Sequence, residues 1–85
     1  MTDYELAALL AKTVAEAPVG EKGNAHVLFG IKYADHLVGR LRRVSLIARF
    51  HFPEADVWPT AQGDISYGVR MARYVVIKES PRWLK

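Results

Sequence analysis

The 85-residue sequence has no cysteine and no apolar stretch long enough to cross a membrane. Without cysteine, neither a disulfide framework nor a thiolate metal site can form, which fits a reducing cytoplasm. Charged residues interrupt every apolar run well before the ~20 residues that a transmembrane helix needs. The polar, acidic start of the chain is unlike a secretory signal peptide. We therefore expect a soluble, cytoplasmic protein without a membrane partner.

Catalytic and metal-binding motifs are also missing. The histidines His26, His36 and His51 lack the close helical spacing of zinc ligands. No serine occupies a nucleophile-elbow motif, and the glycine-bearing segment 19–24 matches neither a P-loop nor a dinucleotide fingerprint. We expect no enzyme, no cofactor and no metal. An enzyme would need a concave pocket that gathers one of these histidines with an acid.

The hydrophobic content of 51% excludes disorder and is sufficient for one core, so we expect a single domain over residues 1–85. The net charge of +3 is unevenly distributed. Residues 1–39 carry three lysines against five acids, whereas residues 40–85 carry nine basic residues against four acids. All seven arginines lie in the second part, and arginine suits bidentate contact with phosphate and guanine. The alternative is solvated surface charge that pairs with Glu54, Asp56, Asp64 and Glu79.

The first half of the chain predicts a helix, a strand and a second helix. Thr2 and Glu5 have the spacing of a capping box and predict a helix over 3–17. The apolar run Val27-Leu28-Phe29 predicts a buried strand over 26–29. From Gly30 onward the apolar spacing is helical, which predicts a helix over 31–39 that Gly39 ends.

The connection to the last helix is less regular. Residues 43–50 predict a short helix, although a strand over 44–47 also fits. The turn over 51–59 contains two prolines and Trp58, which either covers the core or serves as a binding platform.

A helix over 60–73, capped by Thr60 or Asp64, has Gly68 on its narrow apolar stripe. Gly68 costs about 1 kcal/mol of helix propensity relative to alanine. Close approach of a neighbouring helix, such as the one starting at Ile31, would compensate. The β-branched segment 74–78 predicts a strand that pairs with 26–29.

The helix over 60–73 carries the candidate site. Gln62, Ser66, Arg70 and Arg73 recur at intervals of four, four and three residues and so line one stripe, with Tyr67 beside them. A rigid helix with a polar, cationic outer face suits the major groove of DNA. The arginines that would hold phosphates are Arg40, Arg42, Arg43 and Arg49.

Two blocks of sequence resemble a known family. The segment 26–35, HVLFGIKYAD, and the segment 68–75, GVRMARYV, resemble the HTH-like domains of small prokaryotic proteins. Members share a Leu/Phe-Gly-Ile-Lys-Tyr-Ala core and a late glycine, small residue and Tyr-Val ending. The resemblance implies a compact helix-turn-helix or winged-helix fold with DNA binding.

We therefore expect an α+β, mostly helical, winged helix-turn-helix-like fold with three to four helices and a small two-stranded sheet. The expected function is binding of double-stranded DNA, as a transcriptional regulator or a defence- or phage-associated accessory protein. A domain this small would bind weakly as a monomer or act as a homodimer. The alternative is a protein–protein interaction module of helix-turn-helix shape, which Trp58 and Trp83 would favour if they lay exposed near one another.

Overall fold

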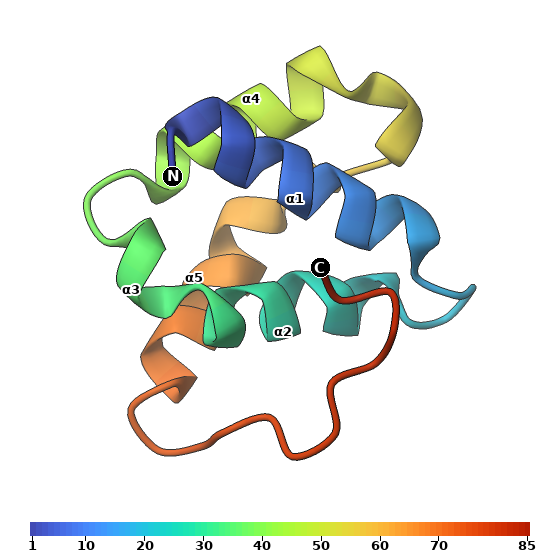
Figure 1. The fold of residues 1–85 in the computed structure, drawn as a ribbon. Coiled ribbons are helices and arrows are strands. Elements are labelled where there is room, and N and C mark those ends of the chain that lie inside the picture. The colour runs from blue at the N-terminus through green and yellow to red at the C-terminus, as the bar shows by residue number, and fades with distance from the viewer.

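The computed structural model describes all residues from 1 to 85 and consists of helices joined by loops (Figure 1). The elements are α1 (Asp3–Glu16), α2 (Lys22–Lys32), α3 (Ala34–Leu37), α4 (Leu41–His51), a 3-10 turn η1 (Pro53–Ala55) and α5 (Ala61–Met71). No residue lies in a β-strand. The predicted α+β class with its two-stranded sheet is therefore wrong, and with it the winged form of the fold.

Helix α1 begins at the predicted capping box. The Thr2 hydroxyl accepts a hydrogen bond from the Glu5 amide at 3.0 Å, and the Glu5 carboxylate accepts one from the Thr2 amide at 2.8 Å. The bond from the Thr2 amide holds the pKa of the Glu5 carboxyl below its ordinary value. Leu6, Leu10 and Val14 are completely buried along one face of the helix. The prediction for this helix is confirmed to within one residue at its end.

Replacing Thr2 by alanine is expected to lower the free energy of unfolding by about 1 kcal/mol, because the Glu5 amide loses its partner. Urea denaturation followed by circular dichroism measures this change. Thr60→Ala is the matched control, since Thr60 occupies the same position before α5 but its side chain makes no capping hydrogen bond. An equal loss in both variants would contradict the role of the capping box.

The strand predicted over 26–29 is wrong, because these residues lie inside α2. Phe29 is completely buried, and Val27 and Leu28 are partly buried. Helix α2 packs against α5 on one side, and Leu28 borders a hollow with Trp83 of the C-terminal segment on another. A helix covered on more than one side needs apolar residues at consecutive positions, which imitates the pattern of a buried strand.

The bounds predicted for the helix over 31–39 are wrong as well. Helix α2 continues through Gly30 to Lys32, and the short α3 follows it. Gly39 does follow α3 with a φ of +79°, which agrees with its predicted place after a helix end. The segment 43–50 lies within α4, so the helical alternative is confirmed.

The strand predicted over 74–78 is wrong as well. Helix α5 ends at Met71, and residues 72–74 form a turn. The chain then runs back along the outside of α2 toward α1 (Figure 1), where Leu84 is buried and the Lys85 amide donates to the Thr13 hydroxyl at 3.0 Å. The segment has no partner strand because its expected partner, 26–29, belongs to a helix.

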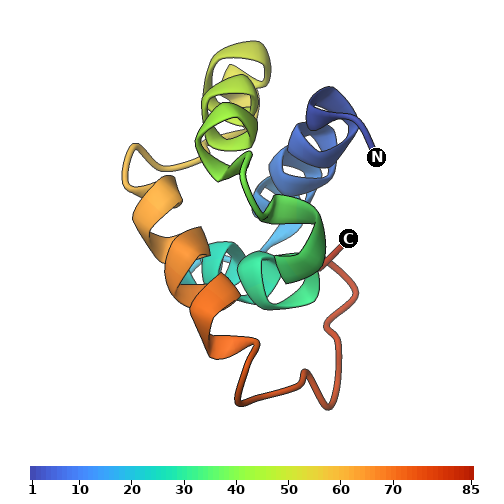
Figure 2. The same ribbon diagram turned by 90° about the vertical axis from the view of Figure 1, so that its left-hand side faces the viewer.

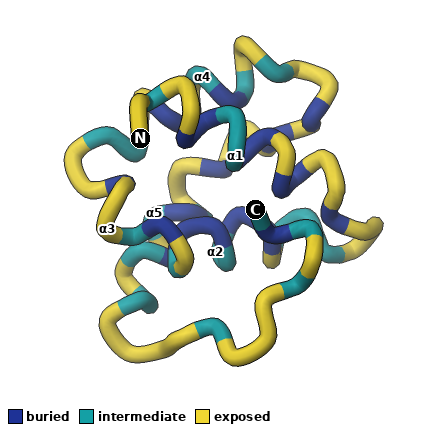
Figure 3. The backbone as a smooth tube through the Cα atoms, in the orientation of Figure 1, coloured by how far each residue is buried: buried dark blue, intermediate teal, exposed yellow.

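The helices form two layers. Helices α1 and α4 make one layer, and α2 and α5 make the other (Figure 2). The buried hydrophobic residues of the helices belong to one core cluster, and Figure 3 marks their positions along the backbone.

Helices α2 and α5 meet through two glycines. A Cβ atom on Gly68 would overlap the main-chain oxygen of Val27, and one on Gly30 would overlap the main-chain oxygen of Ile65. Both glycines are therefore required by the close approach of the two backbones. The close approach predicted for Gly68 is confirmed, although the neighbour is α2 and not a helix that starts at Ile31.

A candidate nucleic-acid interface on helix α5

Helix α5 carries four of the nine predicted site residues: Gln62, Ser66, Tyr67 and Arg70. Ile65 and Gly68 are buried toward α2, so the opposite side of the helix faces solvent. Arg70 donates a hydrogen bond to the Ser66 hydroxyl at 3.0 Å, and its guanidinium lies 5.9 Å from the centre of the Tyr67 ring. Gln62 is exposed one turn before Ser66. Ser66, Tyr67 and Arg70 therefore lie together on the exposed side of the helix.

Arg73 extends this surface beyond the end of the helix. It lies in the turn after α5 and is exposed. Together with Tyr67, Arg70 and Tyr74 it borders a shallow hollow of about 320 Å³. No carboxylate lies within ion-pair distance of Arg70 or Arg73; the ion pairs of the protein involve Asp3 and Glu16. The two charges are therefore free to meet an anion.

Two of the four predicted phosphate-binding arginines on and beside α4 are engaged within the protein. Arg40 pairs with Asp3 at 3.2 Å and donates to the main-chain oxygens of Met1 at 2.7 Å and His36 at 2.6 Å. Arg43 pairs with Asp3 at 2.9 Å. The hydrogen bond from Arg43 is the main cause that lowers the pKa of the Asp3 carboxyl. These two arginines hold the start of α1 against the start of α4, and Asp3 partly neutralises their charge.

The other two arginines of α4 have no carboxylate partner. Arg42 is exposed, and the guanidinium of Arg49 lies 5.1 Å from the centre of the Phe50 ring. Their spacing of seven residues puts them on the same side of α4. They form a second cationic surface on a different element from α5.

The connection from α4 to α5 is organised by His26. Residues 52–60 form this connection, which contains η1 and Asp56 with a φ of +60°. The Trp58 amide donates to Nε2 of His26 at 3.2 Å, and the Trp58 ring lies 5.2 Å from the His26 ring. Trp58 therefore covers a buried residue of α2, as one of the two predictions for it proposed.

Sequence reasoning missed the role of His26, which it placed in a strand. The side chain is completely buried, and its Nδ1 donates to the main-chain oxygen of Lys22 at 2.6 Å. Nε2 must then be the unprotonated nitrogen that accepts from the Trp58 amide. Burial lowers the pKa of the imidazole, which is consistent with a neutral ring. The signal in the sequence for a buried histidine was its position directly before the apolar run Val27-Leu28-Phe29.

No group of three or more histidine and acidic side chains lies close enough to hold a metal ion. Trp58 and Trp83 border different hollows. None of the helices combines the length and the apolar composition needed to cross a bilayer.

Comparison with known proteins gives one result. Curated proteins and solved structures yield no match. The family described as "HTH-like domain" matches residues 2–78, which is nearly the whole chain. The helical architecture and the exposed, cationic α5 agree with this match, and the chain belongs to the HTH-like domain family.

Proposed function

We propose that the protein binds double-stranded DNA through the outer face of α5. The observation that carries the proposal is the pair Arg70 and Arg73, which are exposed and have no carboxylate partner; Arg70 lies on α5, which is fixed against α2, and Arg73 lies in the turn that follows it. An α-helix fits the major groove, and arginine reads guanine or holds phosphate there. Family membership supports the same function. Binding of this kind suits a transcriptional regulator or a defence- or phage-associated accessory protein.

The side chains of the face have separate roles in this proposal. Arg70 and Arg73 approach the groove, and Gln62 and Ser66 add polar contacts to base edges or phosphates. Tyr67 supports the Arg70 guanidinium from below and is exposed enough to contact a phosphate. Arg42 and Arg49 are available for further phosphates. Arg40 and Arg43 already pair with Asp3, which partly neutralises the charge that they can offer to a phosphate.

The double variant Arg70→Ala/Arg73→Ala is expected to bind duplex DNA more weakly and with a smaller dependence on salt. Each arginine that contacts a phosphate contributes about one unit to the slope of log K against log salt, so the slope falls by at most about two, and by less where an arginine contacts a base edge. Fluorescence anisotropy with a random duplex, measured over a series of salt concentrations, gives both quantities.

The double variant Arg42→Ala/Arg49→Ala is the matched control, because it removes the same charge from α4. We expect a smaller loss of affinity from it than from the α5 variant. An α5 variant with wild-type affinity and slope would exclude this face as the binding surface. Equal effects of the two variants would mean that net charge alone, and not the geometry of α5, determines binding.

A further inference from the structure

The segment from Tyr74 to Lys78 is built like a strand but pairs with nothing. Its composition, Tyr-Val-Val-Ile-Lys, has the highest β-propensity in the chain. The amides of residues 76–79 donate no hydrogen bond, and their carbonyls accept none. Tyr74 and Val76 are 79% and 83% exposed. An exposed row of free main-chain groups with apolar side chains is a template for another strand.

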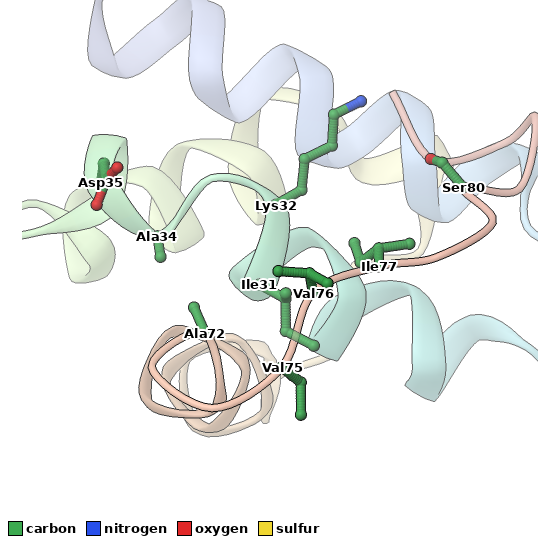
Figure 4. A pocket seen from close by; sticks show the side chains of 9 residues that line it. All are labelled: Ile31, Lys32, Ala34, Asp35, Ala72, Val75, Val76, Ile77 and Ser80. Atoms are coloured by element: carbon green, nitrogen blue, oxygen red, sulfur yellow. The ribbon is translucent and has the colours of Figure 1, made fainter.

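The segment is also loosely attached to the rest of the protein. A hollow of about 440 Å³ separates it from the C-terminal end of α2 (Figure 4). Ile31 and Ala72 border the hollow from the helical side, and Val75, Val76 and Ile77 border it from the segment. The apolar side chains therefore line an open space. The amides of Val76, Ile77 and Lys78 can pair without breaking a hydrogen bond, whereas those of Tyr74 and Val75 already donate to the main-chain oxygen of Met71 at 2.9 and 3.1 Å, so one of these two bonds must be exchanged for a bond to the second copy.

The sequence around Val76 is complementary to itself in the antiparallel direction. When Val76 lies opposite Val76 of a second copy, Val75 lies opposite Ile77 and Tyr74 lies opposite Lys78. The next pair outward is Arg73 opposite Glu79, which have opposite charges. Directly opposite residues share a face of the ladder, so every pair in this register is favourable. The ion pair occurs at both ends of the ladder because of the two-fold symmetry.

We infer that the segment 74–78 pairs with the same segment of a second copy, forming an antiparallel two-stranded ribbon and a homodimer. The chain itself offers no other partner, because the other strand-like segments, 26–29 and 44–47, lie in α2 and α4. The charge complementarity of Arg73 and Glu79 favours an identical copy over an unrelated strand. The inference concerns the protein alone and does not depend on DNA binding. In the dimer Arg73 pairs with Glu79 of the second copy, so Arg70 is then the unpaired arginine of the α5 face.

Such a dimer would also limit the distance between the two α5 helices. Met71, the last residue of α5, is separated from the two-fold axis by residues 72–76. Five fully extended residues on each side would put the two helix ends at most about 33–36 Å apart. Residues 72–74 form a turn, so the actual separation is shorter than this limit.

The oligomeric state of the full chain without DNA tests the inference. In sedimentation equilibrium over a concentration series, we expect the wild type to dimerise in the micromolar range, which suits a small interface. Val76→Lys places two lysines opposite each other at the axis and should weaken the dimer by about tenfold or more. Val19→Lys, at another fully exposed valine, is the matched control and should leave the dimer unchanged.

A charge exchange tests the register. Glu79→Arg should weaken the dimer, because it places two arginines opposite each other at both ends of the ribbon, and Arg73→Glu combined with Glu79→Arg should restore it. A wild type that remains monomeric up to about 1 mM overturns the inference. The partner of the segment would then be a strand of another protein. A dimer that survives Val76→Lys but is lost in Phe50→Lys also overturns it, because its interface then lies on α4. A charge exchange that fails to restore the dimer excludes this register.

Discussion

Replacing Gly68 or Gly30 by alanine is expected to lower the free energy of unfolding by about 3 kcal/mol or more. In each case the new methyl group meets a main-chain oxygen of the opposite helix, which no change of side-chain conformation can relieve. The two helices would have to separate, and the contact between α2 and α5 is the most extensive contact between helices in the fold. Urea or thermal denaturation followed by circular dichroism measures the loss.

Gly63→Ala is the control for this prediction. Gly63 lies in the same helix as Gly68, but a Cβ atom there would meet nothing within 4 Å. Alanine favours a helix over glycine by about 1 kcal/mol, so this variant should equal or exceed the wild type in stability. Wild-type stability in Gly68→Ala would contradict the close packing of α2 and α5, whereas a loss in all three variants would point to a general cost of substitution.

Replacing His26 by leucine is expected to lower the free energy of unfolding by about 2–3 kcal/mol. The substitution keeps an apolar side chain of similar size in the core but leaves the Trp58 amide without its acceptor. The connection between α4 and α5 would then lose the contact that ties it to α2. His36→Gln is the control, because His36 is exposed and its ring nitrogens make no hydrogen bond.

The same histidine should make the stability of the wild type depend on pH. Burial lowers the pKa of His26 in the folded protein, whereas the unfolded chain has an ordinary value of about 6.5. Above that pH the ring is neutral in both states, so stability is complete. As the pH falls below about 6.5 the unfolded chain takes up the proton first, and stability declines toward the lower folded pKa.

Denaturation curves between about pH 7.5 and pH 5 isolate this effect, because carboxyl groups titrate mainly at lower pH. The decline should be missing in His26→Leu and retained in His36→Gln. A wild type with constant stability over this range would show that His26 is not held neutral in the folded protein.

Local signals in the sequence predicted local structure well. The capping box of Thr2 and Glu5 located the first helix, and the i, i+4 spacing of Ser66 and Arg70 put two side chains in contact on α5. Gly68 predicted a close helix contact because its cost in helix propensity needs a compensation in packing. These inferences depend on residues within one or two turns of each other.

The errors arose where the outcome depends on distant residues. Val27-Leu28-Phe29 has the pattern of a strand because α2 is covered on more than one side, which only the assembled fold reveals. The segment 74–78 has the composition of a strand but no partner within the chain. The sequence also did not reveal that Asp3, 37 and 40 residues away, pairs with Arg40 and Arg43, whose assignment to phosphates stays a prediction. No spacing rule connects residues so far apart.

The pairing of the helices has a consequence for how the chain acquires its structure. The main partner of α1 is α4, and the main partner of α2 is α5. The two pairs therefore alternate along the sequence: α2 lies between α1 and α4, and α4 lies between α2 and α5. Neighbouring helices therefore cannot assemble into stable hairpins one after another, and long loops must close before much apolar surface is buried. During synthesis α2 meets its main partner only after residues 61–71 have left the ribosome. We expect slower and more cooperative folding than in a bundle of the same size whose adjacent helices pair.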